Sequence, residues 1–149
     1  MGYYLFLDDE RSPGDVTWAH MPRDKAYTVV RNYDEFVNTI VSFGVPEFVT
    51  FDHDLADHHY EVMLKEVEAH QNNSKFVFWM PGGDDEFEGM NLTFDYGPEK
   101  TGYDCAKWLV DFCVDRGVQF PKYTVHSMNP VGSQRICGYI DNAKKHLAI

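Results

Sequence analysis

Three short apolar runs in this chain each end in a cluster of polar residues, and this repeated pattern limits the folds that the chain can adopt. The central run, residues 48–51 (FVTF), is followed by Asp52, His53 and Asp54. Such a run is typical of a strand buried on both faces; a buried helix segment can look the same, but Pro46 upstream favours the strand. In an open parallel sheet, ligands bind beyond the carboxyl ends of the strands. Asp52 and Asp54 are therefore the first candidates for site residues.

The other two runs lie near the two ends of the chain. Residues 3–7 (YYLFL) lead into residues 8–11 (DDER), and residues 123–125 (YTV) lead into residues 126–129 (HSMN). Acidic residues and asparagine after a single strand are most often turn formers or helix caps. Three such clusters in one chain favour a site that three strand ends share.

Length and composition predict one globular domain over residues 1–149, with 44% hydrophobic and 25% charged residues. The net charge of -11 argues against a protein that coats DNA or RNA, because nonspecific binding depends on Lys and Arg that neutralise phosphates. The chain has no apolar run of the ~20 residues that span a membrane, and it begins without a signal peptide, so we expect a cytoplasmic protein. The three cysteines lack metal-ligand spacing and predict reduced thiols in the core.

The segments between the runs predict alternating strands and helices. The expected elements are a loop over residues 11–25 with one helical turn around Trp18, a strand over residues 26–31, and helices over residues 33–43, 102–116 and 131–146. The first helix has Asn32 as its N-cap and Phe36, Ile40 and Phe43 on its apolar face. A capping box at Thr101 begins the second helix.

Residues 56–100 interrupt this alternation, and we interpret them as an insertion. Residues 60–70 have helical spacing, and residues 75–80 and 91–96 predict a β-hairpin joined by an acidic loop. We expect this insertion to lie over the site as a flap.

The order of the elements predicts an α/β fold of the flavodoxin or receiver type. Right-handed crossovers on a parallel sheet give the strand order 2-1-3-4, in which the third strand lies between the first and the fourth. We therefore expect the following residues to converge on one edge: Asp8, Asp9, Asp52, Asp54, His126 and Ser127.

The converging carboxylates of Asp8, Asp9, Asp52 and Asp54 predict a site for a divalent metal ion. Carboxylates at one edge repel one another unless a cation neutralises them, and hard oxygen ligands suit Mg²⁺ or Mn²⁺ better than zinc. An acidic turn that faces water is the alternative interpretation. Asp52 with a second acid two residues later also permits a nucleophile that forms an aspartyl-phosphate.

Two histidines are candidates for proton transfer. His126 and His53 are the histidines at predicted strand ends, and imidazole exchanges protons near neutral pH, so we predict them as general acid and base beside Asp52. We interpret His58 and His59 as exposed loop residues.

Three further residues are predicted to bind phosphate. Arg11 is able to clamp a phosphate with two donors. Ser127 and Asn129 precede a predicted helix, and a helix N-terminus attracts anions. Helix capping is the alternative role for Ser127 and Asn129.

Four segments resemble the motifs of the cyclic-phosphate processing receiver domain family, a divergent branch of the receiver-like fold. They are residues 5–13 (LFLDDERSP), 51–55 (FDHDL), 101–109 (TGYDCAKWL) and 126–132 (HSMNPVG), so the resemblance covers both ends and the middle of the chain but not the insertion. It implies the processing of cyclic phosphates or related nucleotide phosphoesters. Many members are phage-encoded, which implies a location in the host cytoplasm. By this resemblance, Asp8 and Asp9 match the receiver acidic pair, Asp52 the phosphoacceptor position and Ser127 the hydroxyl residue after the fourth strand.

Two features differ from a receiver of the phosphorelay type. We expect no fifth strand ending in a phosphate-reading lysine, and His53 and His126 stand where relay receivers have no need of histidine. Both differences favour chemistry on a bound phosphoester.

The leading hypothesis is a metal-dependent phosphoesterase, a phosphoric ester hydrolase of the cyclic phosphodiesterase type. Its expected partner is a small phosphate-containing ligand or an RNA end, either a 2′,3′-cyclic RNA end or a ligand derived from a cyclic nucleotide. A non-catalytic module that binds such a ligand is the second hypothesis, and a phosphoacceptor domain is the third.

Overall fold

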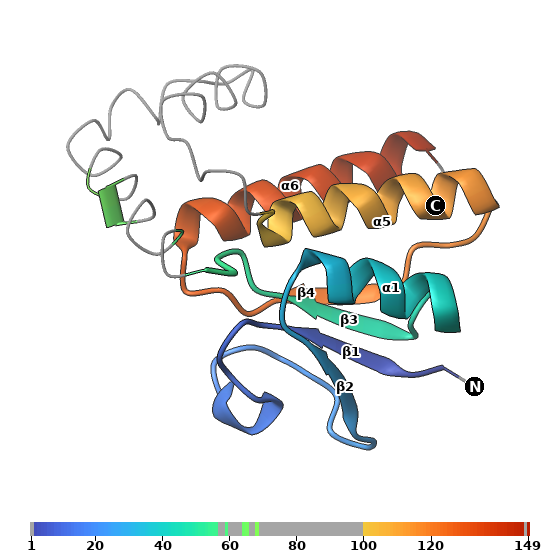
Figure 1. Cartoon of the computed structure of the whole chain (residues 1–149). Helices are drawn as coiled ribbons and strands as arrows, with labels where there is room; N and C mark the ends of the chain where they lie inside the picture. Colours follow the sequence, from blue (N-terminus) through green and yellow to red (C-terminus); the bar gives the residue numbers. More distant parts are fainter. Residues whose placement is uncertain (1, 57–58, 60–63, 66–67, 69–99, 148) are drawn as a thin grey trace.

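A parallel sheet of four strands forms the centre of the fold, in the order β2-β1-β3-β4 (Figure 1). The computed structural model describes residues 2–56, 59, 64–65, 68, 100–147 and 149. Its elements are β1 (Tyr4–Leu7), the 3₁₀ turn η1 (Pro13–Asp15), β2 (Tyr27–Val30), α1 (Tyr33–Phe43), β3 (Phe48–Phe51), α5 (Gly102–Arg116), β4 (Lys122–Val125) and α6 (Pro130–Leu147). The predicted parallel sheet and its strand order are confirmed, and no fifth strand joins the sheet within the described ranges.

The three helices α1, α5 and α6 lie on one face of the sheet (Figure 1). Two crossovers explain this, because α1 joins β2 to β3 and α5 joins β3 to β4 in the same direction across the sheet. Right-handed crossovers that run in one direction place their helices on the same face. The helices bury the main core there, to which the sheet contributes Leu5, Leu7, Val49 and Phe51.

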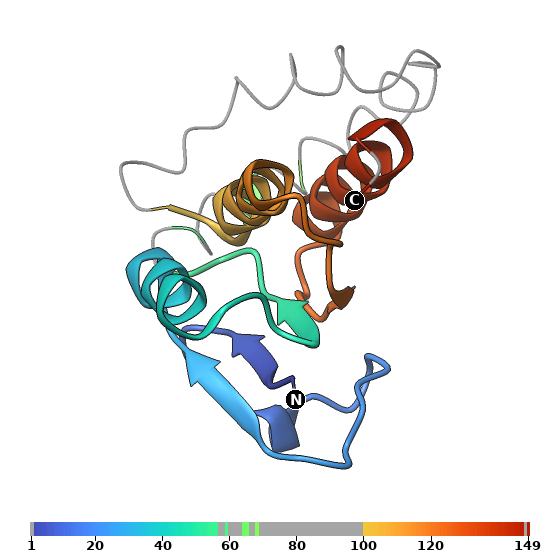
Figure 2. The ribbon, with the colours of Figure 1, turned by 90° about the vertical axis from the view of Figure 1, so that its right-hand side faces the viewer.

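The connection between β1 and β2 runs in the opposite direction and covers the other face (Figure 2). It contains no long helix, and it buries Val16 and Met21 against Phe6 and its neighbours in a second, smaller core. The helical turn expected around Trp18 was wrong. The turn forms at Pro13–Asp15, where proline fixes φ at the first position and the Asp15 carboxylate accepts a hydrogen bond from the Ser12 N–H at 2.9 Å.

The N-terminal cap of α1 agrees with the sequence, but one residue of its apolar face does not. Asn32 accepts a hydrogen bond from the Glu35 N–H at 2.9 Å, and Phe36 and Ile40 are fully buried. Phe43 is 76% exposed, so the apolar face expected from the spacing of Phe36, Ile40 and Phe43 is not buried at its last position. It belongs to the last turn of α1, and its ring contacts the edge of the Tyr3 ring, with centroids 6.5 Å apart.

Helix α5 agrees with the sequence at both ends. The Thr101 N–H donates to the Asp104 carboxylate at 2.8 Å in a capping box, and Gly117 ends the helix in the left-handed region, with φ of 65°. Cys105 and Cys113 are buried as free thiols, as expected, whereas the free thiol of Cys137 is only partly buried. None of the helices in the described ranges combines the length and apolar character that crossing a membrane requires.

The insertion lies almost wholly outside the described residues. Residues 64–65 and 68 are helical, in agreement with the helix expected over residues 60–70. The expected hairpin over residues 75–80 and 91–96, and its position as a flap, lie outside the described residues and stay predictions.

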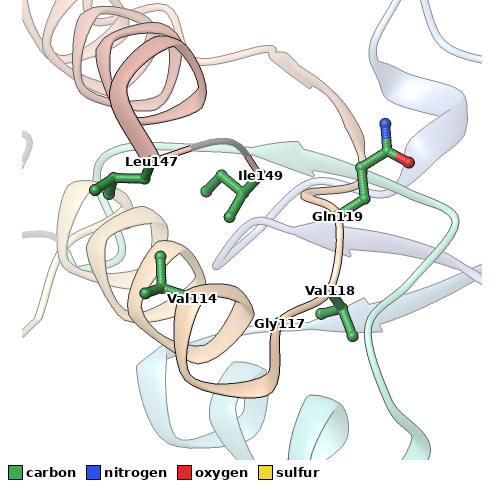
Figure 3. A pocket seen from close by; sticks show the side chains of 6 residues that line it. All are labelled: Val114, Gly117, Val118, Gln119, Leu147 and Ile149. Atoms are coloured by element: carbon green, nitrogen blue, oxygen red, sulfur yellow. The ribbon is translucent and has the colours of Figure 1, made fainter.

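A cavity of about 360 Å³ lies at the C-terminal ends of α5 and α6 (Figure 3). Its lining residues are Val114, Gly117, Val118, Gln119, Leu147 and Ile149. Because the end of α5 leads into the start of β4, this cavity lies at the sheet edge opposite to the carboxyl ends of the strands. It is therefore separate from the acidic residues that the sequence singles out.

Candidate acidic site at the carboxyl edge of the sheet

Asp8, Asp52 and His126 form one buried group, here called the acidic cluster. Phe6, Thr50 and Thr124 are paired with one another across β1, β3 and β4, and each residue of the acidic cluster follows one of them by two positions. Side chains two positions apart on a strand point to the same face of the sheet. All three side chains thus project to the face opposite the helices. One ligand atom from each lies within 4.8 Å of the other two.

Asp8 is held as a carboxylate by four donors. Its Oδ1 accepts from the N–H groups of Glu10 and Arg11 at 2.9 and 2.8 Å, and its Oδ2 lies 3.0 Å from His126 Nε2 and 3.4 Å from Arg11 Nη1. Burial raises the pKa of Asp8, but the hydrogen bonds from His126 and the two backbone groups outweigh it and lower the pKa to about 2. Asp8 is therefore ionised at neutral pH.

His126 is fully buried, and both of its ring nitrogens contact protein groups. Nδ1 lies 2.8 Å from Thr50 Oγ1, and the ring stacks on Phe6 with centroids 4.6 Å apart. Because ionised Asp8 only accepts, Nε2 donates to it, and in the neutral ring Nδ1 then accepts from the Thr50 hydroxyl. The imidazole thus orients Asp8. Its role as general acid or base stays a prediction, since a proton from this ring reaches a ligand only through Asp8.

Asp52 and Asp9 are the carboxylates with the least compensation. Burial and the nearby charges of Asp8 and Asp54 raise the pKa of Asp52 to about 8, although the His53 N–H donates to it at 2.9 Å. Burial and the charges of Asp8 and Glu10 raise the pKa of the half-buried Asp9 to about 6. A cation would remove this repulsion, and the oxygen donors of the group fit Mg²⁺ or Mn²⁺.

His53, Asp54 and Asn129 form a second cluster on the helix-covered side. His53 is fully buried, and its Nδ1 lies 2.9 Å from Asp54 Oδ1. Asn129 Nδ2 lies 3.3 Å from His53 Nδ1 and 3.4 Å from Asp54 Oδ1. Gly132 in the first turn of α6 lies over the ring, where a Cβ would overlap the Cγ of His53. The imidazole is therefore enclosed between β3 and α6, and its catalytic role stays a prediction.

The three residues predicted to bind phosphate have contacts within the protein. Asn129 Oδ1 accepts from the Gly132 N–H at 2.9 Å, and Ser127 Oγ accepts from the Asn129 N–H at 3.1 Å, which are capping contacts of α6. Arg11 pairs with Asp8 while a third of its side chain is exposed. Phosphate binding by Arg11, Ser127 and Asn129 stays a prediction.

A family model described as the cyclic-phosphate processing receiver domain matches residues 3–142. The chain belongs to this family. The match includes all four strands and every residue of the acidic cluster, which confirms the resemblance seen in the sequence. The same comparisons find no match among curated proteins and none among solved structures. This receiver domain is therefore associated with cyclic-phosphate processing.

Sequence reasoning missed two contacts of this receiver domain and misjudged one residue. Thr50 is the one residue with a polar side chain in the run FVTF, and its position two residues before Asp52 placed it on the face of the acidic cluster. Trp18 Nε1 donates to the carbonyl of His126 at 2.8 Å, and no local pattern indicates this contact. The prediction of His59 as exposed was wrong. It is fully buried, and its Nδ1 accepts from the Leu55 N–H at 3.0 Å, which closes the turn after β3.

Proposed function

We propose that this receiver domain is a metal-dependent phosphoesterase that hydrolyses a cyclic phosphate at the acidic cluster. The observation that supports this most is the burial of Asp52 beside Asp8, which raises the pKa of Asp52 to about 8. Two carboxylates kept this close, without a cation between them, destabilise the fold. A divalent ion and the phosphate that it attracts explain why the chain keeps them together.

Asp52 in the acidic cluster and Asp9, which lies outside that cluster, are the proposed main ligands of the ion, with Asp8 beside Asp52 and Asp54 as a further candidate. Asp8 Oδ2 already contacts His126 and Arg11, so the uncompensated carboxylates have the stronger demand for a cation. When bound, the ion supplies Lewis-acid chemistry, since it neutralises phosphate oxygens and favours attack by water.

The chain's own residues then have distinct tasks in the hydrolysis. Water attacks the phosphorus and one ring P–O bond breaks, which gives a phosphomonoester. Asp52, which the cation would keep ionised at neutral pH, is the proposed acceptor for the proton of that water. The leaving oxygen takes a proton from solvent. Arg11, with a third of its side chain exposed beside Asp8, is the proposed ligand of the phosphate oxygens, and His126 fixes the orientation of Asp8.

One observation favours a non-catalytic binding module as the second candidate. His53 and His126 are both fully buried, and each contacts a carboxylate, so neither ring is open to solvent. A site with these contacts is well suited to hold a metal ion and a phosphate without transferring protons. The two candidates share the same ligand and differ only in turnover.

A panel assay tests the proposal. The protein is incubated with nucleoside 2′,3′-cyclic phosphates, 3′,5′-cyclic nucleotides and oligonucleotides with cyclic ends, each with Mg²⁺, Mn²⁺ or EDTA, and phosphorus NMR follows the products. The proposal expects a phosphomonoester only with metal. Metal-dependent binding without product would instead support the binding module. The absence of both binding and product would exclude the phosphoesterase and the binding module.

The variant His126→Gln separates proton transfer from positioning. If the ring transfers a proton by way of Asp8, turnover falls by about 10²- to 10⁴-fold while ligand affinity is kept. If it only orients Asp8, the affinity for Mn²⁺ falls together with turnover. Calorimetry and initial rates on the same preparation distinguish the two outcomes.

A further inference from the structure

Trp18 is 45% exposed, although the loop that contains it is anchored on both sides. Val16 is fully buried and Met21 is 5% exposed in the second core. Arg23 donates to the carbonyl of Val16 at 2.6 Å and to that of Pro13 at 2.8 Å. The indole is therefore displayed by a fixed segment, which is the arrangement that a preformed binding surface requires.

The indole lies beside the acidic cluster. Its Nε1 donates to the carbonyl of His126, which fixes the direction of the ring. The guanidinium carbon of Arg11 lies 5.3 Å from the ring centroid, and Nη1 of the same group lies 3.4 Å from Asp8 Oδ2. A single guanidinium thus spans the gap between an exposed aromatic ring and the carboxylates.

The Trp18 indole and the Arg11 guanidinium together suit the binding of a nucleobase. Bases stack on aromatic rings and on guanidinium planes with little dependence on base identity. The net charge of -11 gives the protein no general attraction for polyanions, so affinity for a nucleotide has to come from local contacts of this kind.

We propose that Trp18 forms a base subsite, on which the nucleobase of a cyclic phosphate stacks while its phosphate lies at the acidic cluster beside Arg11. This rests on the proposed function, because it takes the cyclic phosphate to bind at that cluster. The ligand class is a nucleoside cyclic phosphate, either as a free mononucleotide or as the end of an RNA. Trp18 then determines that the domain selects base-bearing cyclic phosphates over base-free ones.

The test compares three probes in the wild-type protein and in variants. The probes are adenosine 2′,3′-cyclic phosphate, the methyl riboside 2′,3′-cyclic phosphate, which lacks a base, and an oligonucleotide with a cyclic end, all with Mn²⁺. The measured quantity is kcat/KM for a probe that is turned over and Kd for a probe that is only bound. The ratio between the mononucleotide and the oligonucleotide identifies the source of the ligand.

We expect Trp18→Ala to lower the affinity or kcat/KM for the adenosine probe by about 5- to 100-fold. The same quantity for the base-free probe should change by less than about twofold. Trp18→Phe restores most of the loss, because it keeps an aromatic face while it removes the N–H that binds His126. Phe43→Ala is the matched control, since Phe43 is an exposed aromatic residue on the last turn of α1, and it leaves all probes unchanged.

Two results would overturn the base subsite while leaving the proposed function intact. One is a wild-type protein that does not distinguish the adenosine probe from the base-free probe. The other is an equal loss for both probes in Trp18→Ala, with a lowered Tm, which would show that the indole only supports the end of β4. If no cyclic phosphate binds at all, the proposed function fails and the base subsite fails with it.

Discussion

His126 Nε2 and Asp8 Oδ2 lie 3.0 Å apart in the interior, although 118 positions separate the two residues and their strands are not neighbours in the sheet. The strand between them is β3, and its Thr50 contacts the other nitrogen of the same ring at 2.8 Å. One imidazole therefore connects three strands at their carboxyl ends. The orientation of Asp8 depends on this chain of hydrogen bonds.

The Thr50 hydroxyl is expected to donate to Nδ1 of His126, whose tautomer is fixed by ionised Asp8 at Nε2. Thr50→Val keeps the shape of the side chain and removes the donor to Nδ1, so a buried nitrogen loses its partner. We expect a loss of about 1–3 kcal/mol in the free energy of unfolding. Thr50→Ser restores the nitrogen-15 shifts of the ring in NMR spectra. Thr124→Val, the neighbour of Thr50 in the register, is the control. Ring shifts that are identical in wild type and Thr50→Val would contradict the assignment.

Removal of either uncompensated carboxylate is expected to weaken metal binding. Asp52→Asn and Asp9→Asn each lower the affinity for Mg²⁺ or Mn²⁺ by more than tenfold, about 1.4 kcal/mol or more. Asp115→Asn, an exposed acid on α5, leaves the affinity unchanged. Titration calorimetry measures all three variants. Equal affinities in the wild type and both site variants would remove the metal site from the account.

The pH dependence of stability in EDTA is expected to depend on Asp52. The pKa of this group rises from 3.8 to about 8 on folding, so between these values the folded protein holds a proton that the unfolded chain releases. Its contribution to stability is thus complete below pH 4 and is lost as the pH rises towards 8, by at most about 1.4 kcal/mol per pH unit. The contribution of Asp8 to stability has the opposite pH dependence, because its pKa falls to about 2 on folding. This contribution is complete above pH 4 and is lost only as the pH falls below that value.

Chemical unfolding from pH 5 to 8 checks this dependence. The difference in stability between Asp52→Asn and wild type in EDTA should grow as the pH rises, in favour of the variant. Addition of Mn²⁺ should stabilise the wild type most at pH 8. A difference in stability that stays constant from pH 5 to 8 would show that the pKa of Asp52 is not raised in the folded protein.

The close contact between α6 and His53 predicts a specific sensitivity to a methyl group. Gly132→Ala places a Cβ against the imidazole, so either the ring or the helix has to shift, at a cost of about 1–3 kcal/mol. Gly138→Ala in the same helix meets open space and should stabilise the protein by about 0.5–1 kcal/mol. Thermal unfolding of both variants makes the comparison. Equal effects of the two substitutions would show that α6 does not enclose His53.

The sequence predicted the parts of this structure that depend on local pattern. The run FVTF, the capping residues Asn32 and Thr101 and the right-handed crossover rule together gave the sheet order and the edge at which Asp8 and Asp52 meet. Helical spacing placed Phe43 on the same face as Phe36 and Ile40, but periodicity does not tell where a helix passes the end of the sheet.

The contacts between distant segments could not be predicted in the same way. The pairing of Thr50 with His126 requires the register of β3 against β4, and the hydrogen bond from Trp18 to His126 requires the path of the loop across the second face. Both depend on three-dimensional positions that no spacing in the chain encodes. His59 was misjudged for a different reason, because it closes a local turn with Leu55 that the sequence pattern after β3 did not indicate.

The most direct test of the central claim is hydrolysis of a nucleoside 2′,3′-cyclic phosphate in water enriched in oxygen-18, followed by phosphorus NMR. We expect a phosphomonoester that contains one oxygen-18 atom, formed with Mn²⁺ and not with EDTA. We also expect that the rate in Asp52→Asn is lower by at least about 10²-fold and that Asp115→Asn keeps the wild-type rate. A cyclic phosphate that stays intact with Mn²⁺, or one that Asp52→Asn hydrolyses at the wild-type rate, would contradict the proposed hydrolysis at Asp52.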